Sequence, residues 1–395
     1  MSEWKRVKLS DVCEIPITDG THQTPTYASE NEGIPFLSSK DVTSQSIDWQ
    51  NIKYITKDLH EVLYKRIAPK KDDILLAKNG TTGVAALVED DRVFDIYVTL
   101  ALLRPNQNIV YPKYLLRVIN SPFCKRQFDS HLKGIGVPNL HLKEINETKI
   151  PLPPLEEQKR IAAILDKCTA IIAKRKAQLA ALDELVKARF VEMFGVPGSD
   201  TKGWGLQSLG ECCEINPKKS LDNRLVQDLE VSFVPMPAVS DNGIIDVSEK
   251  RLYDEVKTGF TYFAEGDVLF AKITPCMENG KGAVAIGLCN GIGFGSTEFH
   301  VLRPLKNKSN SYWLYLITVF SVFRKNAEAN MTGSAGQRRV PATFLDKYQI
   351  ALPPIELQES FALFVKQVDK SKSIVQKALD ETQLLFDSLM QQYFG

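Results

Sequence analysis

The strongest constraint on the fold is an internal repeat, in which the second half of the chain follows the first at an offset of 200 residues. The string PLPPLEEQ at residues 151–158 returns as ALPPIELQ at residues 351–358. The Phe-Gly pair at residues 194–195 returns at residues 394–395. Both copies of this stretch keep the same length, which predicts one structural element used twice.

The rest of the chain repeats less strictly. WKRVKLSDVCEI at residues 4–15 aligns with WGLQSLGECCEI at residues 204–215 at the same offset. DDILLAKNG at residues 72–80 aligns with GDVLFAKIT at residues 266–274, where insertions have shifted the offset. The chain is therefore predicted to be two diverged globular segments, each followed by a segment of fixed length.

The fixed segments, residues 155–194 and 355–394, are predicted to be long helices. Prolines followed by acidic residues at the start of the first copy are a helix-start signal, and Gly195 suits a C-terminal cap. Alternating steps of four and three residues from Ile161 and from Phe361 meet eight apolar residues out of ten in each copy. That 3.5-residue period predicts a coiled-coil seam. The predicted seam consists of Ile161, Leu165, Ile172, Leu179, Leu182, Val186, Phe361, Val365, Val368, Val375, Leu379, Phe386 and Leu389.

Each such helix could instead pack on its own globular segment. A helix of 40 residues is about 60 Å long, which is too long for one domain of about 150 residues to cover. Two equal seams therefore favour an antiparallel helix pair related by a pseudo-twofold axis.

The globular segments alternate short runs rich in Val, Ile and Phe with Gly, Asn, Asp and Pro breaks, which is typical of small strand-rich domains. The predicted fold class is α+β: two strand-rich α/β domains joined by two long antiparallel coiled-coil helices. The predicted boundaries are 1–150 for the first domain, 151–196 for the central helix, 197–350 for the second domain and 351–395 for the last helix.

Composition excludes several classes of protein. The start MSEWKRVKLS lacks the apolar stretch of a signal peptide, and no apolar run approaches the length needed to span a membrane, so we expect a cytoplasmic protein. The seven cysteines form no CxxC pair and the five histidines show no paired spacing, so we expect neither a metal site nor a catalytic dyad. The glycine-rich NGIGFGS at residues 290–296 is followed by an extended pattern, which argues against a cofactor loop.

Candidate ligand contacts lie in the polar and basic loops. A net charge of +1 gives no bulk argument for nucleic acid, although local groups of Lys, Arg, Asn, Gln, Thr and His can still contact phosphates and base edges. Ordinary solvated turns are the alternative for each loop. The candidate residues are Thr21, His22, Lys40, Lys78, Asn79, Thr81, Lys272, Asn279, Lys281, Gln337, Arg338 and Arg339.

The chain resembles the specificity subunit of type I restriction-modification enzymes. The resemblance rests on IPLPPLEEQKRIAAILD at residues 150–166, its partner IALPPIELQESFALFV at residues 350–365, PCMENGKG at residues 275–282 and GFGSTEFHVLRP at residues 293–304. It covers the whole chain and is most specific in the helical segments. The second copy departs from the pattern in reading IELQ where the first reads LEEQ.

This resemblance implies a non-catalytic subunit that reads a bipartite, asymmetric DNA target through two target recognition domains. Its implied partners are double-stranded DNA, two modification subunits that methylate adenine and, where present, restriction subunits that act as nuclease and translocase. S-adenosylmethionine, ATP and magnesium are implied only for those partners, with no cofactor in this chain. Two other classes stay open from the residues themselves: a coiled-coil scaffold that does not bind DNA, and an enzyme in its own right.

Overall fold

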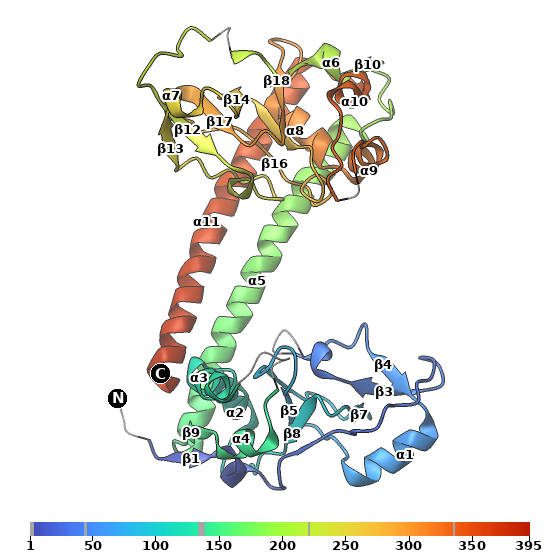
Figure 1. The fold of residues 1–395 in the computed structure, drawn as a ribbon, viewed down its shortest axis with the longest axis vertical. Coiled ribbons are helices and arrows are strands. Elements are labelled where there is room, and N and C mark those ends of the chain that lie inside the picture. The colour runs from blue at the N-terminus through green and yellow to red at the C-terminus, as the bar shows by residue number, and fades with distance from the viewer. Residues whose placement is uncertain (1–3, 43–45, 133–138, 220–221, 335) are drawn as a thin grey trace. The chain divides into compact units, whose positions relative to one another are not determined.

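The computed structural model describes residues 4–42, 46–132, 139–219, 222–334 and 336–395. Its contacts divide the chain into two compact units. The first unit comprises Met1–Arg175 and Ala378–Gly395, and the second comprises Lys176–Lys377. Each unit therefore contains one globular segment and one end of each long helix (Figure 1).

The first globular segment is built on two sheets. A four-stranded antiparallel sheet has the order β2-β8-β5-β6, a three-stranded sheet has the order β4-β3-β7, and β1 pairs with β9. The strands are β1 (Arg6–Lys8), β2 (Thr18–Asp19), β3 (Ile34–Leu37), β4 (Lys53–Ile55), β5 (Ile74–Ala77), β6 (Ala85–Leu87), β7 (Asp95–Ile96), β8 (Leu100–Leu103) and β9 (Lys149–Pro151). The helices are α1 (Lys57–Arg66), α2 (Pro112–Ile119), α3 (Pro122–His131) and α4 (Leu142–Glu147).

The second globular segment repeats this plan with one strand added. Its sheets have the orders β11-β18-β15-β16 and β13-β12-β17-β14, and β10 pairs with β19. The strands are β10 (Leu206–Ser208), β11 (Cys213–Ile215), β12 (Glu230–Val234), β13 (Lys250–Leu252), β14 (Thr261–Ala264), β15 (Val268–Ala271), β16 (Gly282–Val284), β17 (Ile292–Gly295), β18 (Phe299–Pro304) and β19 (Gln349–Ala351). The helices are α6 (Leu209–Cys212), α7 (Tyr253–Val256), α8 (Ser311–Val319), α9 (Ser321–Ala329) and α10 (Ala342–Lys347). The predicted α+β class and internal repeat are thus confirmed.

An ion pair at equivalent places supports each main sheet. Arg104 of the first copy donates two hydrogen bonds of 2.9 and 2.8 Å to the carboxylate of Asp73, just before β5. Arg303 of the second copy does the same to Asp267, just before β15, at 2.8 and 2.7 Å. Both carboxylates are nearly fully buried. The acidic residue in the DDILLAK and GDVLFAK strings therefore serves the scaffold, because paired and buried carboxylates stabilise only when they are well hydrogen-bonded.

The long helices begin and end where the repeat predicts. Helix α5 spans Leu155–Phe194 and helix α11 spans Ile355–Phe394. In the first unit Ile161 of α5 belongs to the same hydrophobic core as Phe394 of α11. In the second unit the rings of Phe190 and Phe361 lie 5.6 Å apart in an edge-on contact. The start of each helix therefore packs against the end of the other, which confirms the antiparallel pair.

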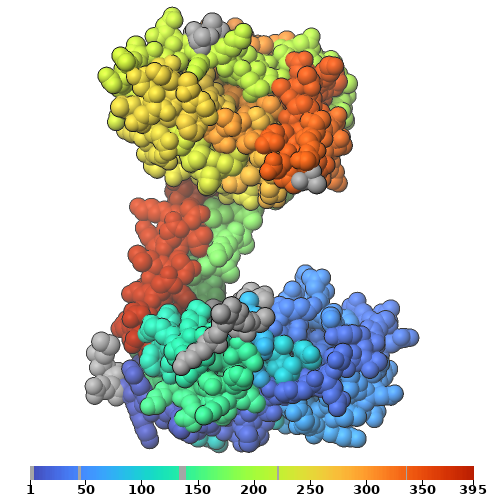
Figure 2. All heavy atoms as spheres, viewed as in Figure 1, coloured from blue at the N-terminus to red at the C-terminus, as the bar shows by residue number. Residues whose placement is uncertain are grey.

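The contacts of α11 with the first globular segment are visible in Figure 2, where its red C-terminal end lies against the teal helices. The rings of Tyr114 in α2 and Phe394 are 5.7 Å apart. Every predicted seam residue is buried or half-buried. Lys372, which interrupts the apolar seam, forms an ion pair with Asp183 of α5, so the interruption carries a compensating charge.

Within the glycine-rich string at residues 290–296, Ile292–Gly295 form strand β17, and the segment that follows contains strand β18, so the extended pattern predicted after the string is confirmed. A side chain at Gly293 would collide with the ring of Phe263, and one at Gly295 with the backbone carbonyl of Val234. Close packing of neighbouring strands therefore explains these glycines. All seven cysteines are free. Among the described residues, no helix is long and apolar enough to span a membrane, and no three His, Cys, Asp or Glu side chains group as metal ligands.

Candidate nucleic-acid interface

The candidate interface is centred on a lysine that directly follows the equivalent strand in both copies, Lys78 after β5 and Lys272 after β15. The Lys78 carbonyl accepts a 2.9 Å hydrogen bond from the Leu140 amide, and the Lys272 carbonyl accepts one of 2.9 Å from the Val340 amide. Each bond fastens the loop after β5 or β15 to the segment that precedes α4 or α10. Two loops that are distant in sequence therefore meet at equivalent places in the two copies.

In the first copy, Asp19 organises this region. Its carboxylate accepts a hydrogen bond of 2.5 Å from Lys78 Nζ and lies 3.2 Å from His22 Nε2. Burial alone would raise the pKa of Asp19, but hydrogen bonds and charges from Lys78 and His22 outweigh it and lower the pKa below its ordinary value. Lys78 is thus a buried, paired cation, whereas the side chain of His22 is 70% exposed. Lys78 is suited to holding the loop, and His22 to contacting a ligand.

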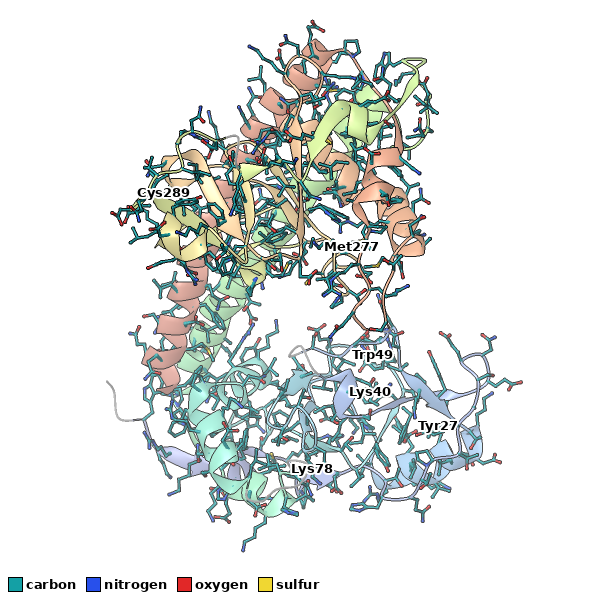
Figure 3. The ribbon with its side chains drawn as sticks, turned by 45° about the horizontal axis from the view of Figure 1, so that its top comes forward. Tyr27, Lys40, Trp49, Lys78, Met277 and Cys289 are labelled. Atoms are coloured by element: carbon teal, nitrogen blue, oxygen red, sulfur yellow. The ribbon has the colours of Figure 1, made fainter. Side chains whose placement is uncertain are left out.

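The other candidates of the first copy are less closely grouped. Thr21 is buried, and its hydroxyl accepts a 3.1 Å hydrogen bond from the Gln23 amide. Lys40 is exposed and donates to the Asn51 carbonyl at 3.3 Å; Figure 3 labels Lys40 and Lys78 as separate positions in this segment. Asn79 forms a β-bridge with Asn139, and Thr81 lies exposed in the loop after β5.

In the second copy, Glu298 takes the organising role. The Arg339 guanidinium donates to both of its carboxylate oxygens, at 2.7 and 2.9 Å. That pairing, opposed by burial, lowers the pKa of Glu298. Lys272 is half-buried beside this pair, and burial lowers its pKa, with Glu298 opposing the shift. The structure thus brings Lys272 and Arg339, two of the predicted residues, to one carboxylate.

The remaining candidates of the second copy surround this group. Arg338 is partly exposed, and its nearest carboxylates, on Glu328 and Glu278, are 3.8 and 4.0 Å away. Asn279 and Gln337 are exposed. Lys281 is partly buried and donates to the Met236 carbonyl at 3.2 Å. Arg338 is consequently less firmly paired than Arg339. Gln337, Arg338 and Arg339 follow Ala335, which lies outside the described residues.

The two carboxylates that organise these groups were not identifiable from the sequence pattern. The role of Gln158 in the repeated PLPPLEEQ string was not predicted either. The fully buried Gln158 side chain accepts a 2.8 Å hydrogen bond from the Tyr111 amide, and donates to the Pro153 carbonyl at 2.8 Å and the Ile109 carbonyl at 3.1 Å. It therefore links the start of α5 to the loop that opens α2.

Gln358 repeats this arrangement in the second copy. It accepts from the Asn310 amide at 2.9 Å and donates to the carbonyls of Pro353 at 2.9 Å and Lys308 at 3.0 Å. We call each glutamine with its three backbone partners the glutamine bracket. The exact recurrence of this residue at an offset of 200 was the available signal. The bracket explains why the string occurs twice, since each long helix must be attached to its own globular segment.

Comparison with known proteins agrees with this architecture. The family model described as the type I restriction modification DNA specificity domain matches residues 1–182 and again 201–382. The EcoAI specificity subunit of Escherichia coli is 40% identical over 194 residues, which are 48% of this chain and 32% of that protein. This chain thus spans about a third of that relative. The putative MjaX specificity subunit of Methanocaldococcus jannaschii is 23% identical over 96% of this chain and 90% of its own length.

Two solved structures share the fold. The type I restriction-modification S subunit from M. genitalium superimposes with a TM-score of 0.56 at 12% identity, covering 100% of this chain and 96% of that one. A chain from a study of complex assembly and conformational transition of the type I R-M system gives a TM-score of 0.54 at 19% identity, covering 100% and 98%. At these identities the likeness concerns the fold alone.

Proposed function

The chain belongs to the type I restriction modification DNA specificity domain family, and from this premise we propose that it is the DNA-reading subunit of a type I restriction-modification complex. Each globular segment then acts as a target recognition domain for one half of a bipartite, asymmetric DNA sequence. The helix pair sets the unread gap between the two half-sites. The cytoplasm, where such a subunit meets DNA, is its expected compartment.

One observation supports this proposal above the others: the two copies share a scaffold but present different loops at the same place. Lys78 and Lys272 occupy equivalent strand ends. The loop that follows β5 is flanked by His22 and Asp19, whereas the loop that follows β15 is flanked by Arg338, Arg339 and Glu298. Two domains that share a scaffold but differ in their polar loops are suited to recognising two different short DNA sequences. A scaffold without DNA recognition is disfavoured by the family match to both copies.

We further propose that the chain is not itself an enzyme. Asp73 of the DDILLAK string is paired with Arg104, and Ile292–Gly295 of the glycine-rich string form a strand, so neither feature supports an active site. Methyl transfer to adenine requires the base to be flipped into a pocket, which we assign to two modification subunits. S-adenosylmethionine then belongs to those partners, and ATP and magnesium belong to restriction subunits where these are present.

Mapping methylated adenines tests the proposal. A host genome is sequenced for methylation after expression of this chain with its modification subunit. We expect methylation at one bipartite sequence with two different half-sites and a gap of fixed length, with one modified adenine on each strand. A continuous target, or methylation that is unchanged when this chain is left out, would contradict the proposal.

A further inference from the structure

A buried arginine lies beneath the loop of the second copy that contains Asn279. Arg324 of α9 is 9% exposed. One terminal nitrogen donates to the Met277 carbonyl and the other donates to the Gly280 carbonyl at 3.0 Å. Figure 3 marks Met277 within this loop. The two bonds hold carbonyls three residues apart, so the planar guanidinium fixes the curvature of the loop between them.

No carboxylate neutralises this guanidinium within ion-pair distance, as far as the described residues extend. Its Nε atom is buried without a hydrogen-bond partner among them. Its charge centre lies 5.7 Å from the centroid of the Phe270 ring. Burial lowers the pKa of Arg324 to about 10, with Tyr315 opposing the shift, so the group stays charged at neutral pH. An unpaired buried charge is costly for folding, so a contribution other than stability is the better explanation for it.

The first copy has no equivalent of this arginine. In α3 the buried residues Cys124 and Phe128 correspond to Phe323 and Ala327 of α9, which places Lys125 at the position of Arg324. Lys125 is exposed and pairs with Asp129 on its own helix. The same helix position therefore faces solvent in one copy and the loop in the other.

The loops themselves differ in length. The Ala77 amide donates to the Val84 carbonyl and the Ala271 amide to the Lys281 carbonyl, so the enclosed loops are residues 78–83 and 272–280. The second loop is thus three residues longer. The shorter loop is closed by its own backbone, through the Gly83 amide and the Ala77 carbonyl at 2.9 Å. The longer loop receives two hydrogen bonds from Arg324 in addition to its backbone bonds.

We propose that Arg324 is a positioning residue that holds the loop of residues 272–280 in the form that reads one DNA half-site. This inference rests on the proposed function and deepens it. It assigns the recognition of one half-site to the loop of residues 272–280, and the conformation of that loop to the Arg324 side chain. Arg324 itself does not reach DNA, since it lies behind the loop. Asn279, exposed on that loop, is the residue it presents.

The test uses the full chain assembled with its modification subunit, in the variants Arg324→Met and Arg324→Lys, with Lys125→Met as the matched control. Binding is measured to the mapped target and to targets with either half-site scrambled. We expect Arg324→Met to lower discrimination at one half-site by about tenfold or more, leaving the other unchanged. The affected half-site should be the one that Asn279→Ala affects and that His22→Ala does not. Arg324→Lys keeps the positive charge but cannot donate from two guanidinium nitrogens to both carbonyls, so it should retain part of the discrimination.

A second readout does not involve DNA. Amide hydrogen exchange in residues 274–282 should become faster in Arg324→Met and stay unchanged in Lys125→Met. Unchanged exchange, or equal loss at both half-sites, would overturn the role of Arg324. If the wild-type complex shows no sequence preference at all, the proposed function fails, and the exchange experiment still decides whether Arg324 orders the loop. Melting temperatures of the variants identify any loss that comes from unfolding.

Discussion

The two copies are most alike where the helices join the globular segments and least alike at the loops after β5 and β15. The glutamine bracket has the same three backbone partners in both copies. The basic side chains near the loops, by contrast, have unrelated partners. Lys78 pairs with Asp19 of β2, whereas Arg339 pairs with Glu298, which directly precedes β18. The comparison indicates that the attachment of the helices is the same in both copies, whereas the polar loops after β5 and β15 have diverged.

The largest effect on stability should come from removing a glutamine bracket. Replacing Gln158 or Gln358 with Leu leaves one amide and two carbonyls unpaired in the interior, so each change should lower the free energy of unfolding by about 3 kcal/mol. Because the brackets are equivalent, the two losses should agree closely. Chemical denaturation measures both, with Gln367→Leu at an exposed position of α11 as control. A loss in only one copy would mean that the brackets are not equivalent.

Arg338 and Arg339 should differ in how they support DNA binding. Arg338 is weakly paired, so Arg338→Ala should weaken binding to all sequences and reduce the salt dependence by about one ion. Arg339→Ala removes the hydrogen-bonded partner of Glu298 and leaves only Lys272 near that carboxylate, so it should weaken binding by about 1 kcal/mol or more. Titrations at several salt concentrations measure both effects.

The double variant Arg339→Ala with Glu298→Ala separates two roles for Arg339. If Arg339 mainly neutralises Glu298, the double variant should recover most of the lost affinity. Persistent loss in the double variant would instead show that Arg339 contacts DNA directly, and that pairing with Glu298 is not its main task.

The smallest effect is a pH dependence of stability that arises in the second copy alone. His300 is buried in β18 and lies 2.8 Å from the Val340 carbonyl, whereas the equivalent position in β8 is Ala101. Burial lowers the pKa of His300 below 6.5, with the Val340 hydrogen bond opposing the shift. As pH falls, His300 is therefore protonated at a higher pH in the unfolded chain than in the folded chain. The free energy of unfolding should decrease as pH falls below about 6.5.

Melting temperatures between pH 8 and pH 5.5 test this dependence. His300→Gln should flatten the pH profile in that window, and His131→Gln, at an exposed position of α3, is the matched control. A profile that His300→Gln does not alter would assign the pH dependence to other groups.

The sequence predicted the helices well because the patterns that specify them lie within the helical segments and occur in both copies. The 3.5-residue seam and the repeated start and end strings determine Leu155–Phe194 and Ile355–Phe394 without reference to the rest of the chain. The loops were identifiable from composition, but their partners were not. Asp19 meets Lys78 across 59 residues, and Arg339 meets Glu298 across 41.

No local pattern specifies such pairs, because they depend on how the strands are ordered in the sheet. For the same reason the sequence did not indicate that Lys78, a predicted ligand contact, is buried and paired with Asp19. Arg324 had no sequence signal at all, since its role follows from the loop that packs above it.

The central claim is that two diverged domains read two half-sites at a distance set by the helices. Inserting seven residues in α5 after Leu179 and seven in α11 after Gln376 preserves the phase of the seam, because seven residues complete one heptad. Each helix lengthens by about 10.5 Å, close to three base pairs of DNA at about 3.4 Å each. Methylation mapping of the lengthened protein with its modification subunit should show both half-sites unchanged and a gap about three base pairs longer. An unchanged gap, or altered bases in either half-site, would contradict the claim.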